Sequence, residues 1–198
     1  MLAVDTSASV DPDRFELQRD GYAAAFRSPQ VQRVITGGAT GAIAVCMTHW
    51  MGYRENLVAH AWTRLSDAAT CSVFADQITA GKRYMDDGQT SISGAMRFAR
   101  GLYERCPFEG SRGRTPRRVI DISGDGQQNE GRYPNEARDE TVAQGITING
   151  LPILAVETGL DRHYRHFVIG GPGAFLIAAD TFEHFADAVR LKLVREIS

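Results

Sequence analysis

The stretch Leu2-Ala3-Val4-Asp5-Thr6-Ser7-Ala8-Ser9 joins a short apolar run to a polar segment. The stretch Val119-Ile120-Asp121-Ile122-Ser123-Gly124-Asp125-Gly126 has the same arrangement further along the chain. Such pairs are typical of buried parallel strands followed by loops, and open α/β sheets place their ligands at the carboxyl ends of their strands. The two stretches therefore predict one functional edge of a parallel sheet.

The polar side chains of these loops are hard oxygen donors. In an extended backbone, residues i, i+2 and i+4 point the same way, so Asp5, Ser7 and Ser9 offer one carboxylate and two hydroxyls on one side. Asp125 adds a second carboxylate, and Thr90 adds a hydroxyl at the start of a predicted helix. We expect these five residues to bind Mg²⁺ or Mn²⁺, with Ca²⁺ as a further candidate, rather than zinc.

The charge of this donor set suggests what completes it. Three of its five members are neutral hydroxyls, which leave a bound ion electron-poor. Such an ion favours an incoming carboxylate from an Asp or Glu side chain of another protein. The donor set therefore predicts adhesion rather than turnover.

Short apolar runs alternate with amphipathic stretches along the chain, which indicates a βαβ architecture. The pattern therefore predicts an α/β fold built around a parallel sheet. The expected strands are 2–4, 41–49, 56–65, 118–123, 146–156 and 174–178. The expected helices are 11–27, 66–80, 92–102, 135–144 and a last one that Asp180 caps.

Length and composition fit one domain over residues 1–198, with 43% hydrophobic residues and a net charge of −2. This charge gives no reason to expect nucleic acid as a partner. Arg112, Arg114, Arg117 and Arg118 do cluster, but they lie in a loop without aromatic residues between them. No apolar stretch is long enough for a membrane span, and no signal peptide is identified.

Three segments together resemble a known family. Asp5-x-Ser7-x-Ser9, Gly88-Gln89-Thr90 and Ser123-Gly124-Asp125-Gly126 are similar, in order and spacing, to the metal-ion-dependent adhesion site of von Willebrand factor type A domains. Two stretches, 117–126 and 145–153, look closer to an uncharacterised bacterial branch of that family. The resemblance implies a three-layer α/β fold, in which helices flank a doubly wound, mostly parallel central sheet. It also implies that Ser7, Ser9 and Thr90 bind the metal directly, and that Asp5 and Asp125 bind it directly or through water.

The resemblance also implies a compartment. The bacterial branch commonly carries export signals, and only four residues precede Asp5, which suggests an upstream segment. We therefore expect a periplasmic or secreted protein if the resemblance holds. Cys71 and Cys106 can pair after export, although buried free thiols are the preferred interpretation for the three cysteines.

Two other functions stay open. One is a Mg²⁺-dependent hydrolase of phosphate esters with Asp5 as nucleophile, although haloacid-dehalogenase-like phosphatases have an aspartate where this chain has Ser7. The other is a metal-free scaffold that binds a protein elsewhere.

Two polar positions outside the donor set also have more than one interpretation. Asp121 lies inside an apolar strand, either as an acceptor behind the metal ligands or in a buried pair with an arginine. His163 and His166 lack a third zinc ligand nearby and are interpreted as surface or packing residues.

Overall fold

The computed structural model describes residues 1–84, 88–108 and 116–198. Asp86, Asp87, Arg112 and Arg114, which belong to two predicted loops, lie outside these ranges. The elements are β1 (Leu2–Asp5), α1 (Pro12–Arg27), α2 (Pro29–Gly37), β2 (Ile43–Trp50), β3 (Asn56–Leu65), α3 (Ala68–Thr79), α4 (Ile92–Tyr103), β4 (Arg118–Gly124), α5 (Pro134–Val142), β5 (Ile146–Pro152), α6 (Leu160–His163), the π-helix η1 (Tyr164–Val168) and α7 (Phe185–Ile197).

Five strands form one sheet in the order β3-β2-β1-β4-β5. β1 pairs in parallel with β2 and β4, β4 pairs in parallel with β5, and β3 is antiparallel to β2. The chain first extends the sheet on one side of β1 and later on the other, so the topological switch point lies between β1 and β4. The structure confirms the predicted doubly wound, mostly parallel α/β fold.

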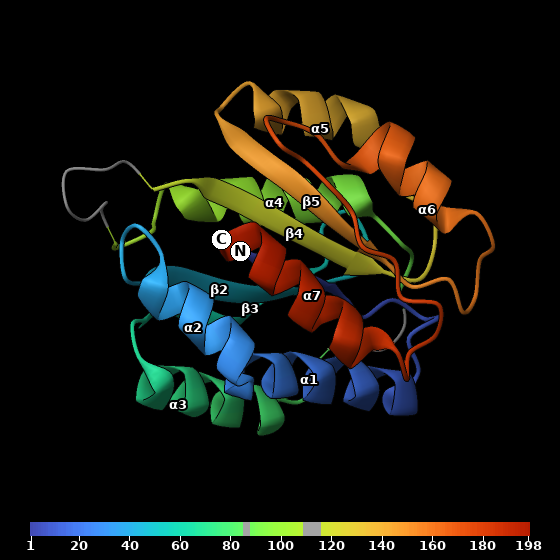
Figure 1. Ribbon diagram of the computed structural model, residues 1–198. Coiled ribbons are helices and arrows are strands. Elements are labelled where there is room, and N and C mark those ends of the chain that lie inside the picture. Colours follow the sequence, from blue (N-terminus) through green and yellow to red (C-terminus); the bar gives the residue numbers. More distant parts are fainter. Residues whose placement is uncertain (85–87, 109–115) are drawn as a thin grey trace.

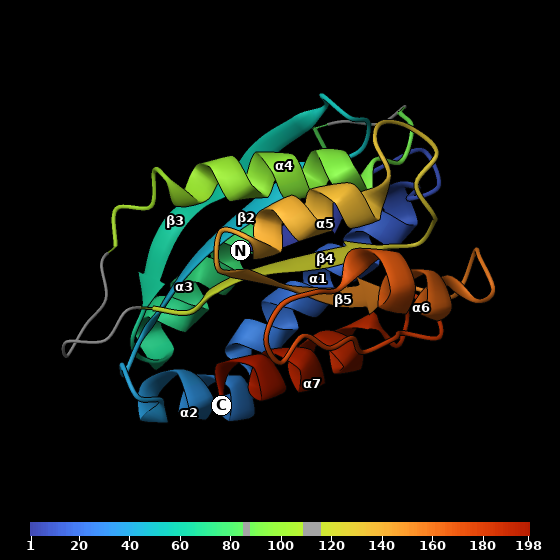
Figure 2. The ribbon, with the colours of Figure 1, turned by 90° about the horizontal axis from the view of Figure 1, so that it is seen from above.

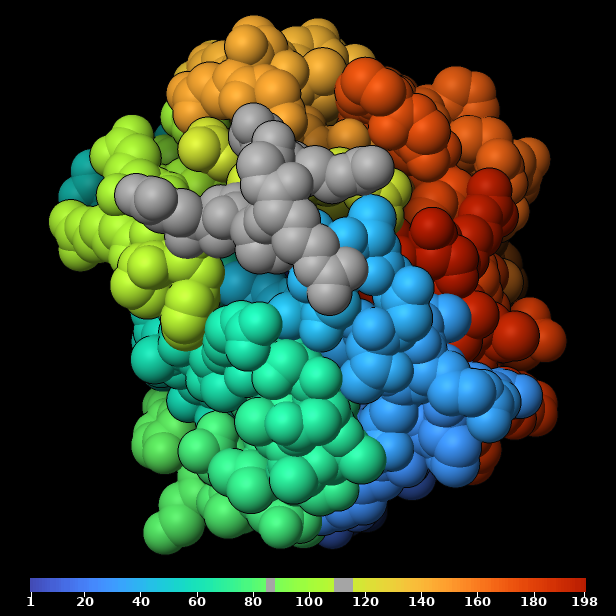
Figure 3. All heavy atoms as spheres, turned by 60° about the vertical axis from the view of Figure 1, so that its left-hand side comes forward, coloured from blue at the N-terminus to red at the C-terminus, as the bar shows by residue number. Residues whose placement is uncertain are grey.

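Helices cover both faces of the sheet (Figure 1). Figure 2 shows α4 and α5 on one side and α1, α2 and α7 on the other. Alternate residues of β1 serve the two layers, because Leu2 and Val4 pack with α1 and α7 while Ala3 packs with α4. Figure 3 shows the side that lies to the left in Figure 1, where parts of α2, α3, α4 and α5 reach the surface.

The helix α2 was not expected. Ser28-Pro29 does end α1, as predicted, but the same pair begins α2. The Ser28 hydroxyl accepts a hydrogen bond from the Gln30 N–H at 3.3 Å, and Pro29 occupies the first turn, where its missing N–H costs nothing. A signal for a helix end was thus also a signal for a helix start.

The predicted sixth strand is wrong. Residues 174–179 follow β5 through isolated bridges at Leu176 and Ala179 and form no continuous ladder. The Asn149 side chain accepts a hydrogen bond from the Phe175 N–H at 3.0 Å, and Pro152 has no N–H to donate. Regular pairing between β5 and residues 174–179 is therefore interrupted.

The chain around this segment differs from the prediction as well. β5 ends at Pro152, not at Val156. Asp180 does not cap the last helix, which begins at Phe185 without a side-chain cap. The helices α6 and η1, which precede this segment, were not predicted as elements of the fold.

The buried partner of Asp121 is a lysine, not an arginine. Lys192 of α7 lies with its Nζ atom 2.5 Å from Asp121 Oδ1 and 3.1 Å from Glu196 Oε2, and both side chains of the Asp121 pair are almost fully buried. Asp121 therefore ties β4 to α7. It does not serve as an acceptor behind the metal ligands.

Two further observations concern the described residues. Cys46, Cys71 and Cys106 are free, and the first two are buried. No helix in the described ranges has both the length and the apolar character that a membrane crossing needs.

Candidate metal site at the sheet edge

The carboxyl ends of β1 and β4 meet at one edge of the sheet, to the right in Figure 1. β1 ends at Asp5 and its loop carries Ser7 and Ser9, while β4 ends at Gly124 directly before Asp125. Thr90 lies two residues before the first residue of α4. Parallel pairing of β1 with β4 places both loops on the same edge, as the two apolar runs predicted.

Hydrogen bonds between side chains connect four of the five predicted residues. The Ser9 hydroxyl donates to Asp125 Oδ1 at 2.6 Å, Ser7 Oγ lies 3.3 Å from Ser9 Oγ, and the Thr90 hydroxyl donates to Ser7 Oγ at 3.4 Å. Asp5 joins through its Oδ1 atom, which accepts the Ser7 N–H at 2.8 Å. The structure thus brings all five oxygen-bearing side chains into one cluster.

Both carboxylates are buried, and each has one unsatisfied oxygen. Asp5 Oδ2 and Asp125 Oδ2 have no hydrogen-bond partner among the described residues, although the guanidinium of Arg14 lies 3.9 Å from Asp125 Oδ2. Burial, and then the negative charge of Asp125, raises the pKa of Asp5 to about 7. Burial also raises the pKa of Asp125. Without a cation, burial and the repulsion between the two carboxylates disfavour their ionised forms.

This arrangement fits a hard divalent cation. Two unsatisfied buried carboxylate oxygens lie in a cluster with three hydroxyl groups, and oxygen donors are what Mg²⁺ and Mn²⁺ prefer. A cation would also offset the repulsion that raises the pKa of Asp5. Asp5, Ser7, Ser9, Thr90 and Asp125 are therefore the candidate ligands.

Four residues that hold these loops were missed from the sequence. Gln18, fully buried, donates to the Asp5 carbonyl, and Arg83 donates to the carbonyls of Thr6 and Ser7. Arg14 donates to the Ser9 carbonyl at 2.6 Å, and Asn129 accepts the Thr90 N–H at 2.8 Å. Each of the four side chains forms a hydrogen bond with a backbone group outside its own element. No short sequence motif therefore identifies these residues.

Gly124 leaves space beside the cluster. A Cβ atom at this position would lie 2.8 Å from Asp5 Oδ2, 3.0 Å from the Tyr164 hydroxyl oxygen and 3.2 Å from the Trp50 ring. The Tyr164 hydroxyl and the Trp50 Nε1–H are buried and, among the described residues, unpaired. A carboxylate oxygen, the unpaired Tyr164 hydroxyl and a carbon of the Trp50 ring therefore surround the space that a side chain would fill.

The two histidines of η1 and its neighbour α6 lie apart from this cluster. His166 Nδ1 is 2.7 Å from the Arg162 carbonyl oxygen, and both His163 and His166 stack near Phe167. In the described part of the chain, no group of three or more His, Cys, Asp or Glu residues is arranged to hold a metal. The candidate site differs from such groups because hydroxyls outnumber its charged ligands.

One family model matches the whole chain, residues 1–198, and is described as a protein of unknown function (DUF1194). No curated protein sequence matches the chain.

Several solved structures resemble the chain in fold. Proximal thread matrix protein 1 from the mussel byssus has a TM-score of 0.68 at 15% identity, covering 97% of this chain and 45% of its own. A von Willebrand factor type A protein from Catenulispora acidiphila has a TM-score of 0.65 at 13% identity, with 99% and 42% covered. The manganese-loaded TRAP protein of Plasmodium vivax has a TM-score of 0.63 at 14% identity, with 99% and 71% covered.

The mussel protein is also known in a form described as having a zinc-occupied MIDAS motif. This chain spans less than half the length of the mussel and Catenulispora structures. At these identities, the likeness shows the fold and nothing finer.

Proposed function

The chain belongs to the DUF1194 family and has the fold of a von Willebrand factor type A domain, and we propose that it is a divalent-metal-dependent binding module. In this proposal Asp5, Ser7, Ser9, Thr90 and Asp125 hold one Mg²⁺ or Mn²⁺ ion, and a carboxylate of a protein partner completes its ligands. The observation that carries the proposal is the clustering of two unsatisfied buried carboxylates with three hydroxyls at the switch point of the sheet.

Charge supports a carboxylate as the partner group. Two carboxylates at most neutralise a divalent ion, while the three hydroxyls add no charge. The loop is open on the side of Ala8, which is exposed, and of Ser9, which is half-buried, whereas Asp5 and Ser7 are fully buried. An incoming anionic group therefore has access from outside the sheet edge.

A binding role also agrees with what surrounds Asp5. Among the described residues, no lysine or histidine forms a hydrogen bond or ion pair with its carboxylate. A lysine or histidine there would assist a nucleophilic Asp5 in phosphate-ester hydrolysis. The mussel and Plasmodium structures, described with zinc and with manganese, support a divalent cation at this kind of fold.

Calorimetry with Mn²⁺ and Mg²⁺ tests the metal. We expect one ion per chain for the wild type and no measurable binding for Ser7→Ala, because its hydroxyl lies between those of Ser9 and Thr90. Ser72→Ala, whose hydroxyl donates only to the Ala68 carbonyl on α3, is the matched control and keeps its affinity. Equal affinity in Ser7→Ala and Ser72→Ala would remove the proposal.

A second assay separates binding from catalysis. We expect no turnover of p-nitrophenyl phosphate with Mg²⁺, and capture of a protein partner that EDTA abolishes. Metal-dependent turnover that Asp5→Asn eliminates would favour the hydrolase instead. Capture that survives EDTA and Ser7→Ala would favour the metal-free scaffold.

A further inference from the structure

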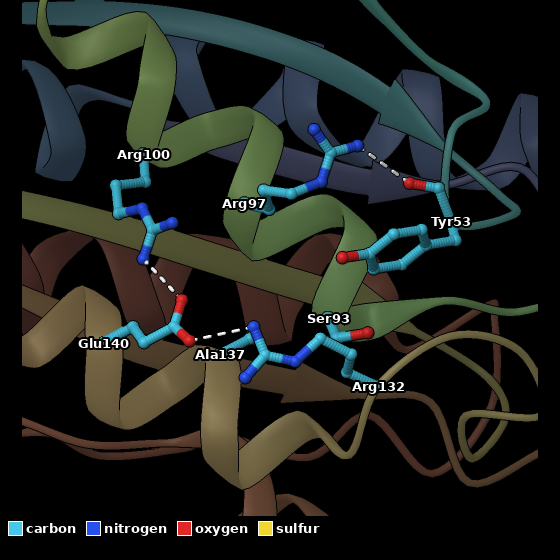
Figure 4. A pocket seen from close by; sticks show the side chains of 7 residues that line it. All are labelled: Tyr53, Ser93, Arg97, Arg100, Arg132, Ala137 and Glu140. Carbon is cyan, nitrogen blue, oxygen red and sulfur yellow. Dashed lines mark hydrogen bonds and ion pairs between the residues drawn. The ribbon is translucent and has the colours of Figure 1, made fainter.

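A cleft lies beside the candidate metal site, between α4, α5 and the loop that joins β2 to β3 (Figure 4). Three arginines line it, Arg97 and Arg100 from α4 and Arg132 from the segment before α5, with Glu140 as the one carboxylate among its lining residues. The net charge of the lining is therefore positive, although the whole chain carries −2. Local positive charge on an acidic protein attracts anions.

Two of the three arginines already have acidic partners. Arg100 Nη1 lies 3.1 Å from Glu140 Oε2, and Arg132 Nη1 lies 2.8 Å from Glu140 Oε1. Arg132 also pairs with Glu136 at 3.0 Å. Each of these two guanidinium groups therefore contacts one oxygen of Glu140, and among the described residues no ion pair joins Glu140 to the third arginine.

Arg97 is the cation without a carboxylate. No acidic side chain in residues 1–84, 88–108 and 116–198 forms an ion pair with it. Its guanidinium nevertheless has a fixed position, because Nη2 donates to the Tyr53 carbonyl at 3.0 Å and its central carbon lies 5.0 Å from the centre of the Tyr53 ring. Most of its N–H donors remain for a planar anion such as a carboxylate.

Glu130 connects the cleft to the candidate metal site. Its side-chain Oε2 atom accepts the Tyr53 N–H at 3.0 Å, and its backbone N–H donates to the Thr90 carbonyl at 3.3 Å. Arg97 follows Thr90 by seven residues; the helical part from Ile92 to Arg97 rises about 8 Å along α4, and Ser91 separates Ile92 from Thr90. An extended peptide covers about 10 Å in three residues.

We propose that this cleft is a second anion site, in which Arg97 binds an acidic side chain three residues away from the one that reaches the metal. The inference rests on the proposed function, because both carboxylates belong to one segment of the same protein partner. Its ligand class is an acidic peptide with the spacing Asp-x-x-Asp. The second contact makes the module selective for a charge pattern rather than for a single carboxylate.

Two synthetic peptides test this spacing. One is Ac-Ala-Asp-Ala-Ala-Asp-Ala-amide, and in the other the second Asp is replaced by Asn. In 5 mM Mg²⁺ we expect the first peptide to bind the wild type about fivefold more tightly, as for a charge-assisted contact at an exposed site. We expect Arg97→Gln to lose this preference. Arg33→Gln makes the same charge change at an exposed residue of α2, and we expect it to keep the preference. An undiminished preference in Arg97→Gln overturns the inference.

A direct measurement keeps the inference apart from the metal. The Arg97 Nε–H resonance is followed in the metal-free wild type during titration with each peptide, and we expect a shift with the two-Asp peptide that is at least halved with the other. If peptide binding does not depend on Mg²⁺ while this shift persists, the proposed metal-dependent function is wrong and the anion site at Arg97 still stands. Absence of the shift overturns the second site, whatever the metal does.

Discussion

Gly124 lies where two groups of the site need space. Asp5 Oδ2 and the Tyr164 hydroxyl oxygen both lie about 3 Å from the point that a Cβ atom would occupy. Burial, and then the charges of Asp5 and Asp125, raises the pKa of Tyr164, so its hydroxyl keeps its proton and is a donor. These two atoms have no hydrogen-bond partner among the described residues, and a side chain at position 124 would displace one or the other. In the proposed site, displacement of a carboxylate ligand weakens metal affinity.

The variant Gly124→Ala tests this arrangement. Its methyl group displaces Asp5 or Tyr164, and we expect Mn²⁺ binding about tenfold weaker or more by calorimetry. Gly126→Ala is the matched control, since a Cβ atom there meets nothing within 4 Å. Equal Mn²⁺ affinity in the two variants would contradict the role given to Gly124.

The raised pKa of Asp5 sets a pH dependence for metal binding. A cation needs the ionised carboxylate, and the pKa of about 7 in the metal-free protein means that a proton competes with the ion below that pH. We expect Mg²⁺ affinity to rise by up to about tenfold per pH unit between pH 5.5 and 7 and to level off above. Calorimetry across this range measures it, and a flat profile would show that Asp5 is not protonated there.

At the scale of elements, a buried ion pair fixes α7 on the sheet. Burial opposes the charge of Lys192, but Asp121 and Glu196 outweigh it and raise its pKa. Burial raises the pKa of Asp121 to about 6, although Lys192 lowers it. Each member of the pair thus needs the other, and removal of one leaves an uncompensated buried charge.

Lys192→Met is therefore expected to destabilise the fold by about 3–5 kcal/mol in urea unfolding. Lys82→Met, which removes the charge of an exposed lysine, is the control and changes stability little. Adding Asp121→Leu to Lys192→Met restores part of the loss, because Glu196, to which Asn149 still donates, is then the one of these two carboxylates left beside the apolar side chain at 192. If Lys192→Met were as stable as Lys82→Met, the pair of Asp121 and Lys192 would contribute no more than a surface contact.

At the scale of the whole molecule, the proposed metal binding would be coupled to folding. In the metal-free native state Asp5 keeps its proton up to a pH of about 7, whereas the unfolded chain loses it near the ordinary aspartate pKa of 3.8. The native state binds more protons across that window, so the contribution of Asp5 to stability falls as pH rises from about 4 to 7. A bound cation replaces the proton as the source of positive charge.

We therefore expect Mg²⁺ to raise the melting temperature of the wild type more at pH 8 than at pH 6. At 100 times the dissociation constant the gain is about 2.7 kcal/mol. In EDTA, the decline of stability between pH 5.5 and 7 is smaller in Asp5→Asn, which cannot titrate. If Mg²⁺ raised the melting temperature of the wild type and of Ser7→Ala equally, the stabilisation would not come from metal binding at this site.

The sequence was sufficient for features that depend on neighbours along the chain. Asp11-Pro12 predicts the start of α1, where Asp11 caps the helix by accepting the Arg14 N–H at 2.9 Å. Apolar runs ending in Asp5 and Ser123-Gly124-Asp125 predict strands that end at one edge of a parallel sheet, as the pairing of β1 with β4 shows. That these residues bind a metal stays a prediction. These signals are local because hydrogen bonds of caps and alternation of strands act within a few residues.

Tertiary packing alone decided the rest, since it brings together groups that no spacing relates. The pair of Asp121 and Lys192 joins the middle of β4 to the middle of α7, and the Asn149 side chain accepts the Phe175 N–H in place of a ladder hydrogen bond. The fixed guanidinium of Arg97 and the space beside Gly124 likewise arise from contacts with distant loops. Burial makes these contacts decisive, because a charge or donor removed from water must find its partner wherever the fold supplies one.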